Sequence, residues 1–436
     1  MKKKMNIYGQ YLNAEQKLNE GLIRKDISDA RPEGYVKTPA DRMRAMAEFL
    51  EVCGNPQQGI PAIHVAGTSG KGSVCAAITG LLKAAGLKVG LHISPYLQSA
   101  TEKIWIDGKY ASADFFSELV DWVMPLALPY RRPETPASIH GMASVAIAFE
   151  AFRREAVDVM VFEAGCGGRY DLTSFVDTHV AVITNIGLDH VVSLGPDITD
   201  IAWHKAGIIR PDIPVVTGAT GDALRIIMAE ARSLNAPLQT VSPSASASVH
   251  NGLLAQTAAI EFARRNGIVF SGSLSDDGHR GVALPGRFEK IMENNNTTVF
   301  LDGAHNTDKL NAAVQHALSE HTTGARIAVV GLLGTKATPK TIAPLEGRFD
   351  RIIVTEPRVY GKAGFPAQDT ATLFSGEALP PIVCPDPLEA VEMAVKMAPQ
   401  GTILICGSFY LCGEVRNKWY PKKDVVLQQT SWPKRL

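Results

Sequence analysis

A glycine-rich heptapeptide, Gly67-Thr68-Ser69-Gly70-Lys71-Gly72-Ser73, has the residue types that bind phosphate. It follows an apolar run and opens a helical pattern. In such a turn, backbone N–H groups curl around a phosphate, Lys71 neutralises its outer oxygens, and Ser73 can reach Mg²⁺. A plain tight turn is the alternative, since Val65 stands where the common phosphate loop has its first glycine. The strand-turn-helix context and Lys71 favour nucleotide binding.

An acidic residue ends another apolar run. Glu163 follows Val161-Phe162 and precedes glycines and Arg169. A carboxylate in that position is costly to bury unless it is paired or bound to a metal. Mg²⁺ prefers one or two carboxylates together with phosphate oxygens, so Glu163 is a candidate ligand. A Glu163–Arg169 ion pair is the alternative.

Two further residues could take part in chemistry. His190 ends the segment NIGLDH, which leaves a third apolar run, and a neutral imidazole there could bind a metal. A lone histidine is more often structural. Lys205 lies among apolar residues near a predicted helix end, and on its own it indicates a solvated lysine.

The elements that must position these residues alternate between strand and helix. The pattern predicts a helix from Thr38 to Gly54 and another from the glycine-rich heptapeptide to Gly86. Apolar β-branched runs predict parallel strands covered on both faces. In the first half these are residues 60–66, 89–93, 157–163, 180–185 and 213–217, and in the second half residues 298–301, 326–330, 351–355, 381–384 and 402–406. A polar stretch beginning at Asp276 leads to a predicted boundary near residue 284, giving domains 1–283 and 284–436.

The composition narrows the class of protein. The chain has 436 residues, with 44 Lys+Arg against 44 Asp+Glu, and this balance argues against nucleic acid or an anionic membrane as a partner. No apolar run reaches the length of about 18 residues that a spanning helix needs. Six cysteines without metal-site spacing favour a reducing cytoplasm.

Taken in order, these segments resemble the folylpolyglutamate synthase/dihydrofolate synthase family of the Mur-type ATP-dependent ligases. The resemblance runs from about Thr38 to Arg416. The matching segments are IHVAGTSGKGS (63–73), SPYL (94–97), EAGCGGR (163–169), NIGLDH (185–190), KAGI (205–208), GRFE (286–289), DGAHN (302–306) and GSFYL (407–411).

The resemblance implies an α/β fold, with an N-terminal P-loop ATPase domain that also meets the pterin substrate and a smaller Rossmann-like C-terminal domain. ATP would lie between them. The implied Mg²⁺ ligands are Ser73, Glu163 and His190. Lys205 matches a lysine that relatives carbamylate with CO₂ to help a second Mg²⁺, and with Lys71 and His190 it forms the expected catalytic set. Three residues would reach the nucleotide from the second domain: Arg287 toward the phosphates, Asp302 toward the ribose, and His305.

The implied reaction transfers the γ-phosphoryl group of ATP to a substrate carboxylate, after which the amine of L-glutamate attacks the acyl phosphate. The expected acceptor is dihydropteroate or a folate, and the expected enzyme is a cytoplasmic monomer. Four positions depart from the usual family pattern: Ser69, Tyr96, Lys103 and Ser174. Except for Ser69, these lie on the side expected to meet the acceptor. Two alternatives stay open: a Mur-type ligase that amidates another carboxylate, and a nucleotide-binding paralogue without turnover.

Overall fold

The computed structural model describes residues 6–23, 38–132, 134–244, 246–269, 282–293, 296–321, 323–358, 364–376 and 379–434. The polar stretch at 276–281 is outside them. The chain forms two compact units. Unit 1 comprises Met1–Tyr96, Ala100–Leu284 and Val426–Thr430, and unit 2 comprises Leu97–Ser99, Pro285–Val425 and Ser431–Leu436. The chain therefore passes between the units at several points, with the main division between Leu284 and Pro285.

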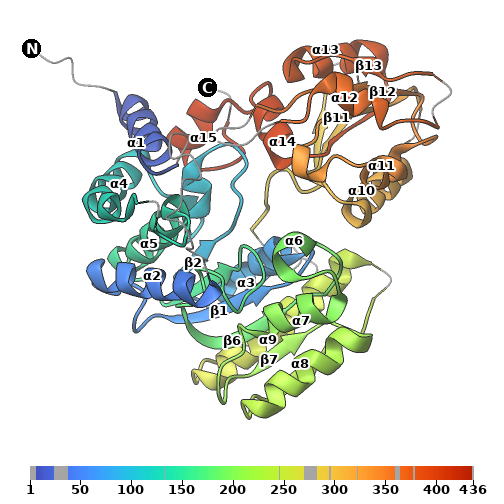
Figure 1. Ribbon diagram of the computed structural model, residues 1–436. Coiled ribbons are helices and arrows are strands. Elements are labelled where there is room, and N and C mark those ends of the chain that lie inside the picture. Colours follow the sequence, from blue (N-terminus) through green and yellow to red (C-terminus); the bar gives the residue numbers. More distant parts are fainter. Residues whose placement is uncertain are drawn as a thin grey trace, which may run out of the picture. The chain divides into compact units, whose positions relative to one another are not determined.

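Unit 1 is built on an eight-stranded sheet in the order β4-β3-β2-β5-β1-β6-β7-β8 (Figure 1). From β2 to β8 neighbouring strands are parallel, and β3 and β4 add an antiparallel edge. In sheet order the strands are β4 (Lys109–Tyr110), β3 (Trp105–Ile106), β2 (Val89–His92), β5 (Val159–Glu163), β1 (Pro61–Ala66), β6 (Asp177–Ile183), β7 (Val215–Thr217) and β8 (Leu238–Thr240). The five strands predicted for this half are confirmed, with shifted ends.

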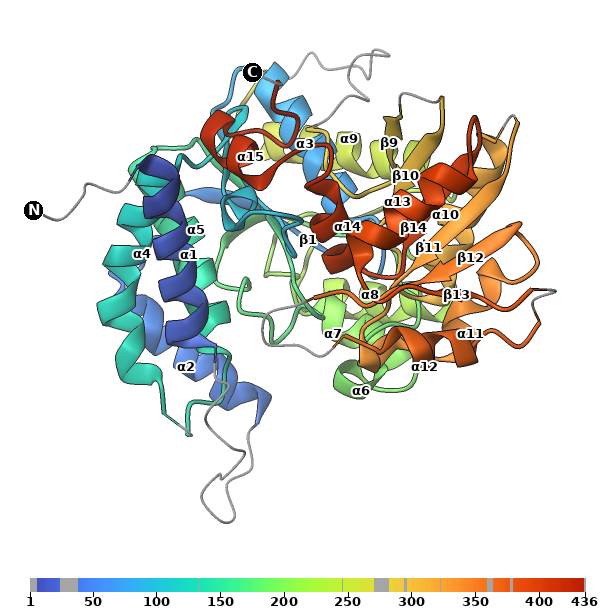
Figure 2. The same cartoon turned by 90° about the horizontal axis from the view of Figure 1, so that it is seen from above.

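Helices cover both faces of this sheet because its strands are apolar on both sides. Met160 and Phe162 of β5 pack into the core that contains α5, while α3 and α9 cover the opposite face. Figure 2 shows α1, α2, α4 and α5 side by side. The helices are α1 (Ile7–Leu22), α2 (Pro39–Val52), α3 (Lys71–Ala84), α4 (Ala113–Ala127), α5 (Ile139–Arg154), α6 (Val191–Leu194), α7 (Ile198–Ala206), α8 (Gly221–Ser233) and α9 (Ala247–Arg265).

Local signals explain where the helices begin. The Thr38 side chain accepts a hydrogen bond from Asp41 N, and the Asp41 carboxylate accepts one from Thr38 N, so a capping box starts α2 as predicted. The predicted second helix is confirmed as α3, which begins at Lys71, so its first turn includes the last residues of the glycine-rich loop (residues 67–73).

Unit 2 contains a six-stranded sheet in the order β13-β12-β11-β14-β10-β9, parallel except for β9. Its strands are β9 (Glu289–Met292), β10 (Thr298–Leu301), β11 (Arg326–Val330), β12 (Arg351–Val354), β13 (Ile382–Val383) and β14 (Thr402–Cys406). The flanking helices are α10 (Thr307–Ser319), α11 (Pro339–Ile342), α12 (Ala367–Thr372), α13 (Pro387–Met397) and α14 (Phe409–Arg416). The last helix, α15 (Lys422–Gln428), begins in unit 2 and ends in unit 1.

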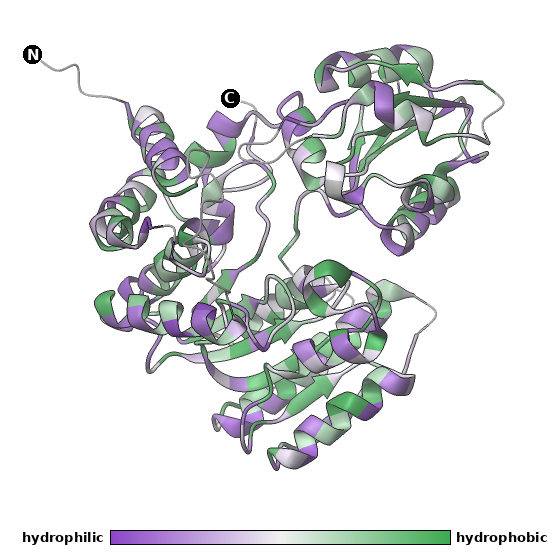
Figure 3. Ribbon diagram, in the orientation of Figure 1, coloured by the Kyte–Doolittle hydropathy of each residue, from purple (hydrophilic) through white to green (hydrophobic). Residues whose placement is uncertain are grey.

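The core of unit 2 follows the two-residue period of its strands. Val299 and Leu301 of β10 pack toward α13 and α14, whereas Phe300 between them packs toward α10. Figure 3 shows that the strands of both sheets are mostly hydrophobic, while the helices carry polar and apolar faces. Among the described residues, no helix is long and apolar enough to span a membrane. All six cysteines are free thiols; Cys53 and Cys166 are only partly buried.

Candidate functional site

Four strand ends bring the candidate residues of unit 1 together. The sheet order β2-β5-β1-β6 makes these strands consecutive neighbours, and all four are parallel. Their carboxyl ends therefore meet at one edge, where ligands sit in open α/β sheets. Val65 pairs with Glu163, and Ala66 pairs with Ile183, so Glu163, the glycine-rich loop and Thr184 are adjacent.

Backbone geometry at the glycine-rich loop requires glycine at two positions. Gly67 has φ +151° and Gly70 has φ +77°. A Cβ on Gly67 would lie 1.8 Å from Thr184 Oγ1. Gly70 is the N-cap of α3 and supplies no side-chain acceptor, which leaves the first N–H groups of this helix available to an anion.

The loop is fixed by hydrogen bonds to the segment that follows β6, residues 184–190, here called the β6 loop. Thr68 N donates to Asn185 O at 3.0 Å, and Ser69 N donates to Asn185 Oδ1 at 2.8 Å. Thr68 Oγ1 donates to Gly187 O at 3.1 Å and accepts from Gly187 N at 2.9 Å. Thr184 Oγ1 donates to Ser69 O at 2.6 Å. These five bonds are called the loop clamp below.

Two lysines converge on one carbonyl oxygen of the glycine-rich loop. Lys205 Nζ donates to Gly67 O at 2.7 Å, and Lys71 Nζ donates to the same oxygen at 3.2 Å. Lys205 is 3% exposed, so the interpretation of this residue as a solvated lysine is wrong. It is buried because α7 packs onto the sheet and turns the side chain toward the end of β1, a tertiary contact that its local sequence does not reveal.

Glu163 is buried at the end of β5 and is 3% exposed. Its Oε2 accepts a hydrogen bond from Ser94 N at 3.0 Å, while Oε1 accepts none from the described residues. Arg169 instead pairs with Glu230 at 2.7 Å and stacks on Trp203, so the alternative of a Glu163–Arg169 ion pair is wrong. A buried carboxylate with a single donor fits a Mg²⁺ ligand.

His190, the last residue of the β6 loop, has a left-handed backbone conformation with φ +54°. Its side chain is 43% exposed, and Nε2 lies 4.0 Å from Asp189 Oδ1. Among the residues that the structure describes, no group of three or more His, Cys, Asp and Glu side chains could hold a metal on its own. This suits Mg²⁺, which takes few protein ligands and completes its shell with water and phosphate.

The segment after Glu163 is held by a buried carboxylate. Asp171 Oδ2 accepts from Cys166 N at 2.8 Å, and Oδ1 accepts from the Thr173 hydroxyl at 2.6 Å. Because that hydroxyl donates to Asp171, His64 Nε2–H donates to it in turn, at 2.9 Å. Burial lowers the pKa of His64 to about 3, so this ring is neutral.

The candidate nucleotide residues of unit 2 also gather at strand ends. The Arg287 guanidinium lies 5.1 Å from the centre of the Phe409 ring. A Cβ on Gly303 would lie 2.4 Å from that ring, so glycine is needed for this approach. His305 Nδ1 donates to Gly303 O at 2.7 Å, which leaves Nε2 as the acceptor, 3.4 Å from Lys309 Nζ.

Asp302 follows β10 and is held by backbone donors. Oδ2 accepts from Phe288 N at 2.9 Å, and Oδ1 accepts from Ala304 N at 2.8 Å. Burial raises the pKa of Asp302 from 3.8 to about 6, although these donors and Arg287 oppose the shift. The carboxylate is thus costly to keep charged, which suits a residue that contacts a ligand.

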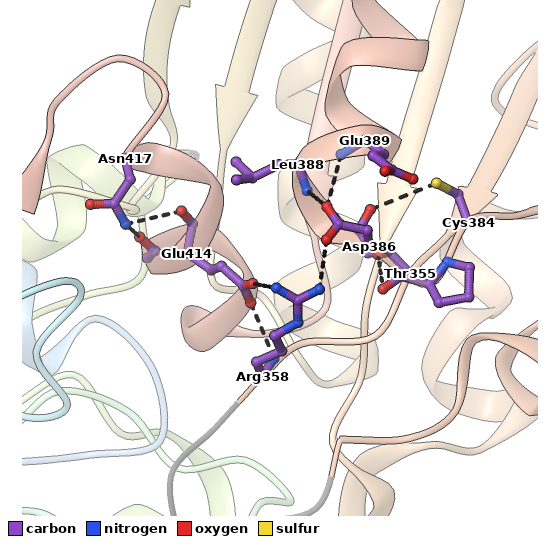
Figure 4. Close-up of polar contacts among 10 residues, drawn as sticks. Thr355, Arg358, Cys384, Asp386, Leu388, Glu389, Glu414 and Asn417 are labelled. Carbon is purple, nitrogen blue, oxygen red and sulfur yellow. Dashed lines mark hydrogen bonds and ion pairs between the residues drawn. The ribbon is translucent and has the colours of Figure 1, made fainter.

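A second polar cluster in unit 2 joins the ends of β12 and β13 to α14 (Figure 4). Arg358 bridges Asp386 at 2.6 Å and Glu414 at 3.5 Å. Asp386 also caps α13 by accepting from Leu388 N and Glu389 N. This packing accounts for the cluster, because Arg358, Asp386 and Glu414 are paired with one another.

A small cavity in unit 1 contains two of the four departures from the family pattern. Tyr96 and Lys103 line it together with His140 and Ser144 of α5 and Asn19 of α1. Burial, assisted by the Lys103 charge, lowers the pKa of His140 to about 4, so Lys103 is the cationic group of this wall at neutral pH. Ser94, two residues before Tyr96, bonds to Glu163, so the cavity wall is continuous in sequence with the candidate metal site.

Sequence reasoning missed several residues of these sites. Thr184 lies in the predicted strand 180–185 but has no predicted role, Lys309 belongs to no quoted motif, and His140 lies in a helix that the motifs do not reach. The only sequence signal for Thr184 is its position directly after β6, at the edge where ligands bind.

Comparison with known proteins agrees with this architecture. The family model described as "Mur ligase middle domain" matches residues 65–289, and the one described as "Mur ligase, glutamate ligase domain" matches residues 286–409. The dihydrofolate synthase/folylpolyglutamate synthase of Mycobacterium tuberculosis is 32% identical over 374 residues, covering 74% of this chain and 75% of that protein.

Solved structures give the same result. A structure of Mycobacterium tuberculosis folylpolyglutamate synthase complexed with ADP has a TM-score of 0.80 and 26% identity, covering 95% of this chain and 99% of that one. A bifunctional folylpolyglutamate synthase/dihydrofolate synthase with Mn, AMPPNP and L-glutamate bound has a TM-score of 0.71 and 27% identity, covering 88% and 95%. The chain therefore belongs to the folylpolyglutamate synthase/dihydrofolate synthase family of the Mur ligases.

Proposed function

We propose that the protein is an ATP-dependent amide ligase that joins L-glutamate to the carboxylate of dihydropteroate or a folate. The observation that carries this proposal is the edge of the unit 1 sheet, where the glycine-rich loop, the buried Glu163 and the buried Lys205 are adjacent. A phosphate-binding loop beside an unneutralised carboxylate suits a metal nucleotide. The relatives whose structures contain ADP or AMPPNP support the choice of nucleotide.

In this proposal the glycine-rich loop (Gly67, Thr68, Ser69, Gly70, Lys71, Gly72 and Ser73) binds the phosphates, and Lys71 leaves Gly67 O to contact them. Ser73, Glu163 and His190 would hold Mg²⁺, and a second metal would lie near Lys205. When bound, the metal neutralises charge on the transferring phosphoryl group. Arg287, Asp302 and His305 of unit 2 would bind the phosphates and ribose of the same nucleotide.

The acceptor carboxylate attacks the γ-phosphorus and ADP leaves, which gives an acyl phosphate. The uncharged amine of glutamate then attacks the acyl carbon, and phosphate leaves as the amide forms. Activation is needed because a carboxylate is a poor acyl donor to amines, and the crowded negative charge calls for Lys71. Lys205 is proposed to be the carbamylated lysine: its amine bonds to CO₂ and releases a proton. An intact-mass increase of one CO₂, absent in Lys205→Met, tests this step.

A second candidate function differs in the acceptor. Tyr96, Lys103 and His140 line one cavity, and the first two are departures from the family pattern. A cavity wall with one lysine charge and a neutral imidazole suits an acceptor whose polar groups are arranged differently from those of dihydropteroate or a folate. A mass-resolved assay that offers several pteroates, folates and other carboxylates separates the two candidates.

The proposed function is tested by measuring ADP and phosphate release with ATP, Mg²⁺, glutamate and dihydropteroate or tetrahydrofolate. Release is expected only when glutamate and the acceptor are both present. AMP and pyrophosphate as products would contradict the proposed mechanism, and nucleotide binding without any turnover would favour a non-catalytic paralogue. We also propose a cytoplasmic monomer, which light scattering of the purified protein and cell fractionation test.

A further inference from the structure

The loop clamp joins two segments of the proposed site, of which the glycine-rich loop contacts the phosphates and, through Ser73, the metal, while the β6 loop contacts the metal alone. The glycine-rich loop is assigned to the phosphates, and the β6 loop ends at His190, which is assigned to the metal. Thr184 and Asn185 make three of the five bonds, through a side-chain hydroxyl, a side-chain amide oxygen and a backbone carbonyl. The two loops are thus joined directly by side-chain and backbone hydrogen bonds.

The clamp also determines which N–H groups can face a phosphate. Thr68 N and Ser69 N are both occupied by Asn185, so neither is free for an anion. The donors left for the phosphates are those from Gly70 onward, at the start of α3. The backbone N–H groups of Thr68 and Ser69 therefore contribute to the phosphate site by holding the loop in shape, while the helix end supplies N–H donors.

We propose that Thr184 and Asn185 are positioning residues that couple metal binding at the β6 loop to nucleotide affinity at the glycine-rich loop. Ordering of the β6 loop by the metal is transmitted to Ser69 through the Thr184 hydroxyl and the Asn185 amide. Coupling of this kind is reciprocal, so Mg²⁺ tightens nucleotide binding and the nucleotide tightens Mg²⁺ binding through the same bonds. The inference rests on the proposed nucleotide and metal sites.

Thr184→Val tests the inference, since it removes the hydroxyl that donates to Ser69 O and keeps the shape of the side chain. Thr217→Val is the matched control. Thr217 ends the neighbouring strand β7, is fully buried, and donates its hydroxyl to Ile183 O at 2.9 Å without contacting the glycine-rich loop. Thr184→Ser restores the hydroxyl. Thermal unfolding of all three variants measures the structural cost of each change.

The readout is the dissociation constant of AMPPNP measured by calorimetry, once with Mg²⁺ and once with EDTA. The dissociation constant in EDTA divided by the dissociation constant in Mg²⁺ measures the coupling. A buried neutral hydrogen bond changes an equilibrium constant by about fivefold, so Thr184→Val is expected to lower this ratio by about fivefold. Thr217→Val and Thr184→Ser are expected to keep the wild-type ratio. This holds even if Thr217→Val lowers the melting temperature as much as Thr184→Val does.

Asn185→Ala is a second variant, which removes only the acceptor of Ser69 N–H and is expected to lower the same ratio. If Thr184→Val and Asn185→Ala bind AMPPNP more weakly by the same factor with and without Mg²⁺, the coupling proposal is overturned while the nucleotide site stands. If the wild-type protein binds AMPPNP with no dependence on Mg²⁺, the metal site of the proposed function and the coupling that rests on it both fail.

Discussion

Lys71 offers a sharp test of the glycine-rich loop, because its expected effects on stability and on turnover differ widely. Lys71→Met removes a charge at the first position of α3. In the structure its Nζ makes a 3.2 Å hydrogen bond to Gly67 O, and that oxygen keeps the 2.7 Å bond from Lys205. The free energy of unfolding is therefore expected to change by less than about 1 kcal/mol.

The expected effect on turnover is much larger. A preorganised group that stabilises developing charge on the phosphoryl oxygens is worth about 10²–10³ in rate, or about 3–4 kcal/mol of transition-state stabilisation. Lys71→Met should thus lower kcat/KM for ATP by at least about a hundredfold. A coupled assay of ADP release measures the rate, and urea unfolding measures the stability.

Lys83→Met is the matched control for this prediction. Lys83 lies on the same helix, α3, near its other end, where it pairs with Asp107 at 3.2 Å. It carries the same charge and is 44% exposed. Turnover within a factor of about two of wild type is expected for this variant. Turnover of Lys71→Met within threefold of the control would refute the assignment of the loop to phosphate.

Two further predictions concern buried charges in unit 2. Because burial raises the pKa of Asp302 from 3.8 to about 6, the folded state binds this proton more tightly than the unfolded state, so its contribution to stability is fully present below pH 3.8 and is lost as the pH rises through about 6. As the pH rises across that interval, the free energy of unfolding should fall by up to about 3 kcal/mol more in wild type than in Asp302→Asn, as measured by urea unfolding. The same pH dependence of the free energy of unfolding in both proteins would contradict this. Arg416→Met leaves Glu289 buried without its 2.7 Å partner and should cost about 3–5 kcal/mol in urea unfolding, partly restored by adding Glu289→Gln; a loss below about 1 kcal/mol would contradict the pairing.

Much of the fold and the candidate site could be predicted from sequence, because parallel strands that are buried on both faces form continuous apolar runs. Glu163 at the end of one run, and Gly67 and Asp302 directly after two others, could therefore be placed at ligand-binding edges before the strand pairing was known. β9 was missed because Glu289-Lys290-Ile291-Met292 has two charged residues followed by two apolar ones and so lacks the alternation of a half-buried strand, although its burial alternates, with Glu289 buried against Arg416.

Other features depend on contacts between residues far apart in sequence. Leu97–Ser99 belongs to unit 2 because Gln98 bonds to the buried Arg416 and to Tyr420 O. The burial of Lys205 and the partner of Arg169 likewise follow from the packing of α7 and α8. No local sequence pattern encodes these contacts, because Gln98, Lys205 and Arg169 are residue types that occur equally well on a solvated surface.

Activation of the acceptor carboxylate as an acyl phosphate can be followed by the transfer of labelled oxygen from the carboxylate to phosphate. The acceptor is supplied with ¹⁸O in its reacting carboxylate, and the phosphate released with ATP and glutamate is analysed by mass spectrometry. Because the carboxylate oxygen attacks phosphorus and then leaves with it, one labelled oxygen is expected in each phosphate released. Phosphate without label, formed alongside amide product, would contradict it.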